Sequence, residues 1–199
     1  MRRQLITGLL MTLVLTVLLG VVYPLAMTGV AQVFMGHRAD GSLVRTDGRV
    51  VGSSLVGQNF VLPDGSPDPK YFQSRPSAAG ENGYDAMSSG GTNDGPSSET
   101  LLDEVTQRVT DYRELNGLAA NARVPVDAVT ASGSGLDPDI SVANARLQAP
   151  RVARARGLRD DQVLALVDAH TDDRPFGFLG EKTVNVLDLN LALDQISTK

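Results

Sequence analysis

An uncharged run from Gln4 to Gly36 opens the chain and limits what the rest of it can be. The run consists mostly of Leu, Val, Ile, Met, Gly and Ala, and basic residues lie on both sides of it. About 20 apolar residues, at a rise of about 1.5 Å each, cross a hydrocarbon core of about 30 Å. The run therefore predicts a transmembrane helix over residues 7–27. Tyr23-Pro24 interrupts the pattern, and an apolar shoulder continues to residue 35.

A cleaved signal peptide is the alternative to an uncleaved anchor. A signal peptide has a basic start, a shorter apolar run and small residues at its cleavage site. Here the apolar run is too long, and the best small-residue site, Ala26-Met27-Thr28, lies inside continuing apolar sequence. We therefore expect an anchor that is retained.

The orientation of this anchor does not follow from charge alone, because arginines lie beyond both of its ends. The first helix usually sets the topology, and long domains translocate largely regardless of their charge. We therefore expect residues 1–6 in the cytoplasm and residues 36–199 outside the membrane.

Small residues recur along the run and suit close packing against a second membrane helix. They are Gly8, Gly20, Ala26, Gly29 and Ala31. Ordinary membrane-helix composition explains them as well, so a docking helix and a plain tether both remain open.

Composition bounds the remaining part of the chain. About 160 residues are enough for one soluble domain with its own core. The net charge of −5 gives no basic footprint for nucleic acid. The chain has no cysteine, which excludes disulfides and Cys-ligated zinc.

The residue patterns after the anchor predict an α+β domain. Residues 42–51 predict a hairpin around Asp47-Gly48, and residues 54–61 a further strand. A helix is expected after the capping candidates Ser97 and Ser98, and it should stop at Asn116-Gly117. Its apolar stripe, which we expect to be core, includes Leu102, Val105, Val109 and Tyr112.

Towards the C-terminus the patterns predict several short elements. A second helix should run from a cap at Asp139 or Ser141 to Gln148, and Pro150 should start or kink a third that stops at Gly157. The remaining elements are a helix opening at Arg159-Asp160-Asp161, a strand over residues 183–187 and a helix over residues 189–196.

Residues 63–98 are rich in Gly, Pro, Ser, Asn and Asp, a composition that fits a disordered linker. They also contain Tyr71, Phe72, Arg75-Pro76 and Tyr84, which a plain linker would not need. Long segments without regular structure inside a domain are usually functional or disordered. We expect an ordered loop that covers the surface of the domain.

The glycines at positions 133 and 135 invite a phosphate-binding interpretation, which their surroundings do not support. A P-loop needs a Lys-Ser/Thr pair after its glycines, because the ammonium group neutralises phosphate charge. Here Leu136-Asp137 follows, and Pro138 takes the place of the third glycine in a dinucleotide fingerprint. A turn that caps the next helix explains the pattern better.

No catalytic or metal-binding set emerges from the remaining residues. The sequence has no Gly-x-Ser-x-Gly elbow and no His-Glu-x-x-His pattern. His37 fits a polar anchor at the membrane boundary, and His170 fits a cation at a helix end. Asp137/Asp139 and Asp172/Asp173 could be acid pairs or Ca²⁺ ligands, but helix caps and turns explain such spacings. We therefore predict no catalytic residue and no metal site.

Several stretches, in order along the chain, resemble one family. They are Gly20-Val-Val-Tyr-Pro-Leu25, Tyr71-Phe-Gln-Ser-Arg-Pro-Ser77, Ser89-Gly-Gly-Thr-Asn93, Val124-Pro-Val-Asp-Ala-Val-Thr-Ala-Ser-Gly-Ser-Gly-Leu-Asp-Pro138 and Val184-Asn-Val-Leu-Asp-Leu-Asn190. Together they resemble KdpC, the C subunit of the bacterial Kdp potassium-transporting P-type ATPase.

The resemblance implies a single-span, non-catalytic accessory subunit of the bacterial inner membrane. Its expected partners are a channel-like potassium-binding subunit and an ATP-hydrolysing subunit. The family is described as a catalytic chaperone that raises the ATP affinity of the ATP-hydrolysing subunit. The resemblance is therefore the only reason to expect ATP as a ligand. No intrinsic cofactor is expected.

Two alternatives stand beside this interpretation. A domain outside the membrane meets no ATP, so the first alternative is a purely structural subunit at the potassium entrance that binds no nucleotide. An anchored external hydrolase is the other alternative, for which no nucleophile–base pair is found. The Ser89-Gly90-Gly91 stretch resembles part of a transporter-type ATP signature. The candidates for contact with a partner or nucleotide are Tyr71, Arg75, Ser89, Gly90, Gly91, Asn93, Asp127 and Ser134.

Overall fold

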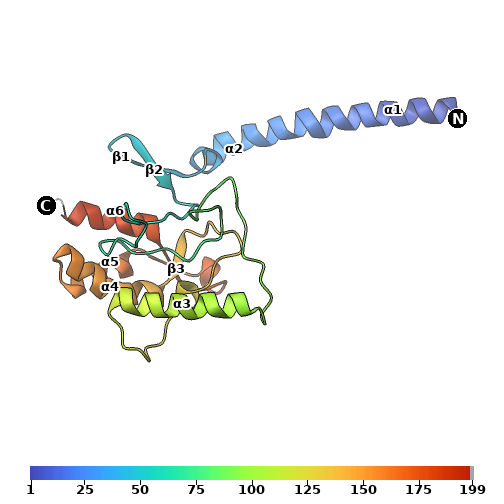
Figure 1. The fold of residues 1–199 in the computed structure, drawn as a ribbon. Helices are drawn as coiled ribbons and strands as arrows, with labels where there is room; N and C mark the ends of the chain where they lie inside the picture. The colour runs from blue at the N-terminus through green and yellow to red at the C-terminus, as the bar shows by residue number, and fades with distance from the viewer. Residues whose placement is uncertain (198–199) are drawn as a thin grey trace. The chain divides into compact units, whose positions relative to one another are not determined.

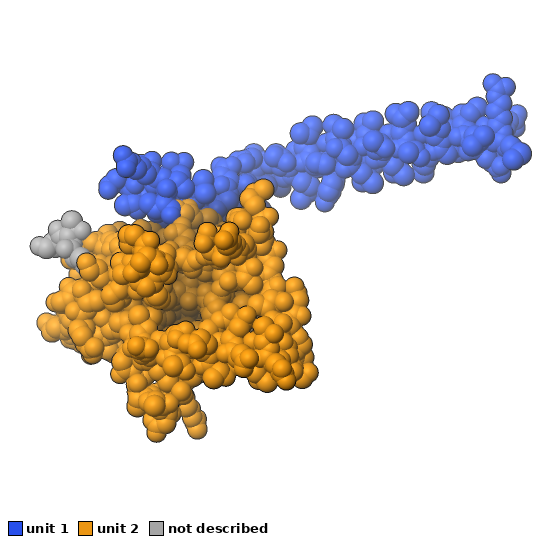
Figure 2. All heavy atoms as spheres, in the orientation of Figure 1, with its two compact units in different colours: residues 1–51 blue, residues 52–199 orange. Residues whose placement is uncertain are grey.

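The computed structural model describes residues 1–197 and divides the chain into two compact units, residues 1–51 and 52–199 (Figure 2). The first unit is a long helix followed by most of a β-hairpin. The second is a mixed body of helices and short strands (Figure 1). The architecture is α+β with a long apolar N-terminal helix, as the sequence predicts.

The N-terminal helix has three parts. These are α1 (Arg2–Val17), a π-helical turn η1 (Leu18–Val22) and α2 (Tyr23–Ala39). Within the described residues it is the one helix that is long and apolar enough to cross a membrane, by length and composition.

The interruption expected at Tyr23-Pro24 is not an end of the helix. Proline has no N–H to donate to the preceding turn, and the helix widens into a π turn just before Pro24. The backbone leaves helical geometry only at Met35, where φ is −142° and ψ is 38°. That position coincides with the end of the predicted apolar shoulder.

The predicted hairpin is present as β1 (Leu43–Thr46) and β2 (Arg49–Ser53). Asp47 and Gly48 have φ of +51° and +77°, as a type I′ hairpin turn requires. The strand predicted over residues 54–61 is wrong. The Ser53 side chain accepts from the Leu55 N–H at 3.1 Å, and this tight turn leaves only isolated bridges.

The second unit is built around a three-stranded antiparallel sheet of order β3-β5-β4. The strands are β3 (Asp139–Ser141), β4 (Thr171–Asp172) and β5 (Thr183–Asn185). The core joins this sheet to three helices, α4 (Val142–Arg156), α5 (Asp160–Ala169) and α6 (Val186–Ser197). The core side chains include Ile140, Ala149, Val152, Val163, Val167, Val184, Leu189 and Leu193.

Two helix boundaries differ from the predictions. A single helix, α4, replaces the two expected around Pro150 and continues to Gly157, which has φ of +67°. The proline removes one backbone hydrogen bond, but Ala149 and Val152 beside it are fully buried, and this packing outweighs the loss. The last helix begins at Val186, directly after a strand shorter than expected.

Helix α3 (Glu99–Asn116) has its predicted ends, with Ser98 accepting from the Leu101 N–H and Gly117 in the left-handed region. The predicted core stripe is confirmed only in part, because Tyr112 is buried while Val105 and Val109 are half-buried. None of its residues belongs to the core cluster, and Leu102 is 57% exposed. The helix lies beside α4 (Figure 1) and buries mainly Tyr112 and Asn116, so its contact with the body is largely polar.

Candidate partner-binding surface

The Tyr71–Ser77 stretch is held by side-chain amides that act in place of a neighbouring strand. The Phe72 N–H donates to Asn190 Oδ1 at 2.9 Å, and the Phe72 carbonyl accepts from Asn190 Nδ2 at 3.0 Å. One residue further, Gln148 makes the same two-point pairing with the Gln73 backbone, at 2.7 and 3.0 Å. Since Phe72 is fully buried, the loop is part of the packed body, as expected for an ordered loop.

Arg151 fixes the residues that precede this stretch. Its guanidinium donates to the carbonyls of Pro69 at 2.8 Å and Tyr71 at 3.0 Å, and to Asn116 Oδ1 at 3.0 Å. Burial lowers the pKa of Arg151 to about 10. The charge is nevertheless retained at neutral pH, and the carbonyls replace the water that it loses.

Arg75 connects the loop to the segment before β3. It forms an ion pair with Asp137 at 2.7 Å, and both side chains are mostly buried. Its backbone carbonyl accepts from the Tyr84 hydroxyl at 2.7 Å. Desolvation raises the pKa of Tyr84 to about 12, so this hydroxyl is a proton donor over the physiological range.

The two glycine-rich segments lie against each other. The Gly90 N–H and the Ser89 hydroxyl both donate to the Ser134 carbonyl at 2.9 Å. A Cβ on Gly91 would come within 3.3 Å of the Gly133 carbonyl oxygen, and one on Gly135 within 2.7 Å of the Gly90 carbonyl oxygen. Glycine is therefore required at this contact for the close approach of two backbones. Their polar groups are used to hold the loops together.

Of the other candidates, Asp127 and Tyr71 make contacts elsewhere, whereas Asn93 is bonded to Gly91. Asp127 accepts from the Ser141 N–H at 2.8 Å and from Asn144 Nδ2 at 3.0 Å, so it reinforces the start of α4. Asn93, exposed and with φ of +58°, donates to the Gly91 carbonyl at 2.9 Å. Tyr71 stacks on Phe60 elsewhere on the body.

Tyr71 also lies under a charged group. The Arg156 guanidinium lies 4.6 Å from the centroid of the Tyr71 ring and pairs with Asp194 at 2.8 Å. Burial, followed by the charge of Asp194, raises the pKa of the Tyr71 hydroxyl. The structure therefore brings together Ser89, Gly90, Gly91 and Ser134 at the glycine contact, with Asn93 bonded to Gly91. Arg75 pairs separately with Asp137, and Tyr71 and Asp127 lie outside these contacts.

The acidic pairs noted in the sequence have structural partners. Asp137 pairs with Arg75, while burial raises the pKa of Asp139, which accepts from the Thr183 hydroxyl at 3.3 Å. Asp173 pairs with Lys182 at 2.6 Å. Within residues 1–197, no group of three or more His, Asp or Glu side chains could hold a metal ion.

Gln148, Asn190 and Arg151, which hold residues 69–73, are called the polar clamp below. A cleft of about 650 Å³ separates α3 from the loop that this clamp holds. One wall consists of residues 73–76, the other of α3 side chains that include Arg108, Tyr112 and Leu115, and Gln148 lies between them. One signal in the sequence points to this arrangement, because Gln148 occupies a buried-face position among the apolar residues of α4. Gln148 and Arg151 were not among the predicted candidates.

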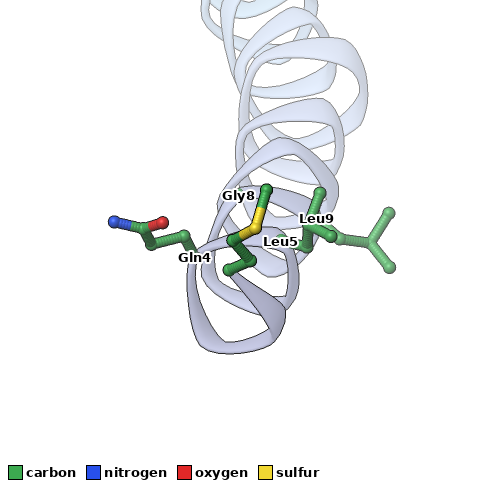
Figure 3. Close-up of a pocket in the computed structure, with 5 residues that line it drawn as sticks. Gln4, Leu5, Gly8 and Leu9 are labelled. Carbon is green, nitrogen blue, oxygen red and sulfur yellow. The ribbon is translucent and has the colours of Figure 1, made fainter.

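A second groove lies along the first two turns of α1 (Figure 3). It is lined by Met1, Gln4, Leu5, Gly8 and Leu9, and Gly8 leaves a gap between larger side chains. The lining is apolar and carries no group that could perform chemistry. It is a surface suited to lipid tails or to another helix.

The chain thus combines one candidate membrane helix with an α+β body whose polar groups are mainly used to order its own loops. The family model described as "KdpC: K+-transporting ATPase, c chain" matches residues 5–195. The chain belongs to this family, the KdpC subunits of the potassium-transporting ATPase.

Curated relatives agree over almost the full length. The potassium-transporting ATPase KdpC subunit of Mycobacterium tuberculosis (strain ATCC 25618 / H37Rv) is 58% identical over 196 residues, which cover 98% of this chain and 100% of the relative. The KdpC subunit of Koribacter versatilis is 52% identical, covering 98% and 95%. That of Gemmatimonas aurantiaca is 51% identical, covering 99% and 95%. The resemblance seen in the sequence is confirmed.

Proposed function

We propose that this chain is a non-catalytic accessory subunit that holds the Kdp-type ATPase together and shapes its potassium entrance. Its partners would be the channel-like potassium-binding subunit and the ATP-hydrolysing subunit. The observation that carries the proposal is that the side chains of Gln148, Asn190 and Arg151 hold residues 69–73 in one ordered arrangement. A loop fixed in this way offers a preorganised surface, which lowers the entropy lost on docking.

The membrane helix contributes to the same function. Residues 7–27 would span the membrane with residues 1–6 in the cytoplasm and residues 36–199 outside, and the shoulder to residue 35 would contact a partner. Its side chains are exposed along its whole length, so they are available for lipid or another helix. Replacing residues 7–35 with a uniform leucine span should keep the chain in the membrane but weaken assembly.

A chaperone effect on ATP affinity is compatible with this role if it acts indirectly. The Ser89-Gly90-Gly91 stretch resembles part of an ATP signature, but its groups donate to Ser134 instead of facing an open site. The purified full chain in detergent should therefore show no saturable ATP binding at millimolar nucleotide. Saturable binding would favour the second candidate function, in which the body itself binds nucleotide.

Co-purification tests the proposed function. An affinity tag on the C-terminus of this chain should recover two larger membrane proteins, a multi-span channel-like subunit and a P-type ATPase, from gently solubilised membranes. The recovered complex should hydrolyse ATP faster when potassium is added. Recovery of this chain alone, together with undiminished potassium uptake in cells that lack it, would contradict the proposal.

A further inference from the structure

The loop between β4 and β5 ends in an uncharged apolar tip that the fold leaves in solvent. The aromatic tip, as we call residues 175–180, has the sequence Pro-Phe-Gly-Phe-Leu-Gly. Phe176 is 87% exposed, Phe178 72% and Leu179 47%. None of them belongs to the core cluster of the described residues, so their large apolar surface does not stabilise the body.

The aromatic tip is nevertheless ordered by its own contacts. The Gly177 N–H donates to the Arg174 carbonyl at 2.8 Å, and the Leu179 N–H donates to the Pro175 carbonyl at 3.1 Å. Below the tip, Asp173 pairs with Lys182 and Arg174 pairs with Glu181. These ion pairs continue the register in which Asp172 lies opposite Thr183. The two phenylalanines therefore project from a closed hairpin.

The backbone at Phe176 is unfavourable for the residue that occupies it. Its φ is +55°, in the left-handed region that Gly and Asn adopt with less strain. An exposed phenylalanine at such a position gains nothing from the body that could offset the strain. Strained, exposed residues of this kind are typical of binding sites.

We propose that the aromatic tip is an anchor that inserts into an apolar hollow on another protein subunit of the same ATPase complex. The inference rests on the proposed function, because it requires that the chain work within this complex. Aromatic side chains on rigid elements are typical of residues that dominate interface energies.

Charge favours a protein hollow over a lipid surface. Membrane-binding loops combine apolar side chains with unpaired basic residues that attract anionic lipids. Here both basic residues beside the tip, Arg174 and Lys182, are paired with acids, and Asp172 leaves the surrounding segment with an excess of negative charge. An uncharged tip on a stem whose basic residues are both paired fits an uncharged apolar hollow better than an anionic lipid surface.

Alanine substitution tests the anchor in the full chain. Phe176→Ala/Phe178→Ala should lower the recovery of the larger subunits about tenfold or more, while the unfolding midpoint of the chain stays unchanged. The control is Met87→Ala, which removes a side chain that is 93% exposed but lies outside the tip. Wild-type recovery with the double variant would overturn the proposal. If the wild-type chain itself recovers no partner, the proposed function fails first.

Photochemical crosslinking identifies the occupant directly. Benzoylphenylalanine is placed at position 178 of the full chain in native membranes and irradiated, and the adduct is analysed by mass spectrometry. A covalent adduct with another subunit of the complex supports the anchor. Adducts with lipid alone, or no adduct while the complex is intact, overturn it. The same probe at position 87 is the control and should give no subunit adduct.

Discussion

Gln148 pairs with the backbone of Gln73 at two points, through its Oε1 at 2.7 Å and its Nε2 at 3.0 Å. A side chain of α4 thus satisfies one donor and one acceptor of a loop that has no neighbouring strand. Asn190 of α6 does the same for Phe72. Two helices therefore fix the loop through side-chain amides.

Removing the Gln148 amide should destabilise the chain strongly. Gln148→Leu keeps most of the side-chain volume but leaves the N–H and carbonyl of Gln73 without these partners. We expect the free energy of unfolding to fall by about 2–4 kcal/mol. Urea unfolding of the full chain in detergent, followed by circular dichroism, measures it. Arg146→Leu on the exposed side of α4 is the control, with a change of about 1 kcal/mol or less. Equal losses would contradict the clamp.

The Arg75–Asp137 pair should show measurable coupling, since both side chains are largely withdrawn from water. A double-mutant cycle with Arg75→Met and Asp137→Asn should give a coupling energy of about 1–2 kcal/mol in urea unfolding. The same cycle at the exposed Arg159–Asp161 pair should give no measurable coupling, because water screens that pair. Equal coupling at the two pairs would show that Arg75 adds nothing specific to the fold.

Glycine is required at position 135 but not at position 133. Gly135→Ala adds a Cβ at φ of +66° that would lie 2.7 Å from the Gly90 carbonyl oxygen, whereas Gly133→Ala meets nothing within 4 Å. We expect the first change to cost about 2–4 kcal/mol of unfolding free energy and the second about 0.5 kcal/mol or less. Limited proteolysis should also cut residues 77–98 faster in Gly135→Ala. Similar stability of the two variants would refute the contact between the glycine segments.

Tyr84 should give the chain a stability change at high pH. Burial raises the pKa of Tyr84 to about 12, above the usual value of about 10 for a tyrosine, so folding favours the protonated phenol. Its contribution is fully present below pH 10 and is lost as the pH rises through 12. Tyr84→Phe should lose about 1 kcal/mol near neutral pH with the hydrogen bond to the Arg75 carbonyl, and its stability should fall less between pH 10 and 12. Parallel pH curves for the two proteins would contradict this assignment.

Local chemistry made part of the fold predictable. The uncharged run, the Asp47-Gly48 turn and the ends of α3 at Ser98 and Gly117 each depend on residues close in sequence. These elements could therefore be predicted where the determining residues are local, whereas the strand expected over residues 54–61 and the two helices expected around Pro150 could not. The family resemblance, carried by whole stretches in order, was also sufficient to identify the family.

Non-local packing explains what could not be predicted. Pro150 does not break α4, because residues on both sides of it are buried in a core whose composition is set by distant segments. The stripe of α3 does not join that core cluster, because a cleft separates α3 from the loop. Gln148 belongs to the polar clamp, and its partner at Gln73 lies 75 positions away in the sequence.

If this chain holds the ATPase complex together, recovery of one larger subunit with the other must depend on it. The ATP-hydrolysing subunit is purified by a tag from cells with and without this chain, and the amount of channel-like subunit recovered with it is quantified. We predict that recovery falls about tenfold or more without the chain and is restored by the full chain in trans. Equal recovery in both cells, with equal potassium-stimulated ATP hydrolysis, would contradict the account.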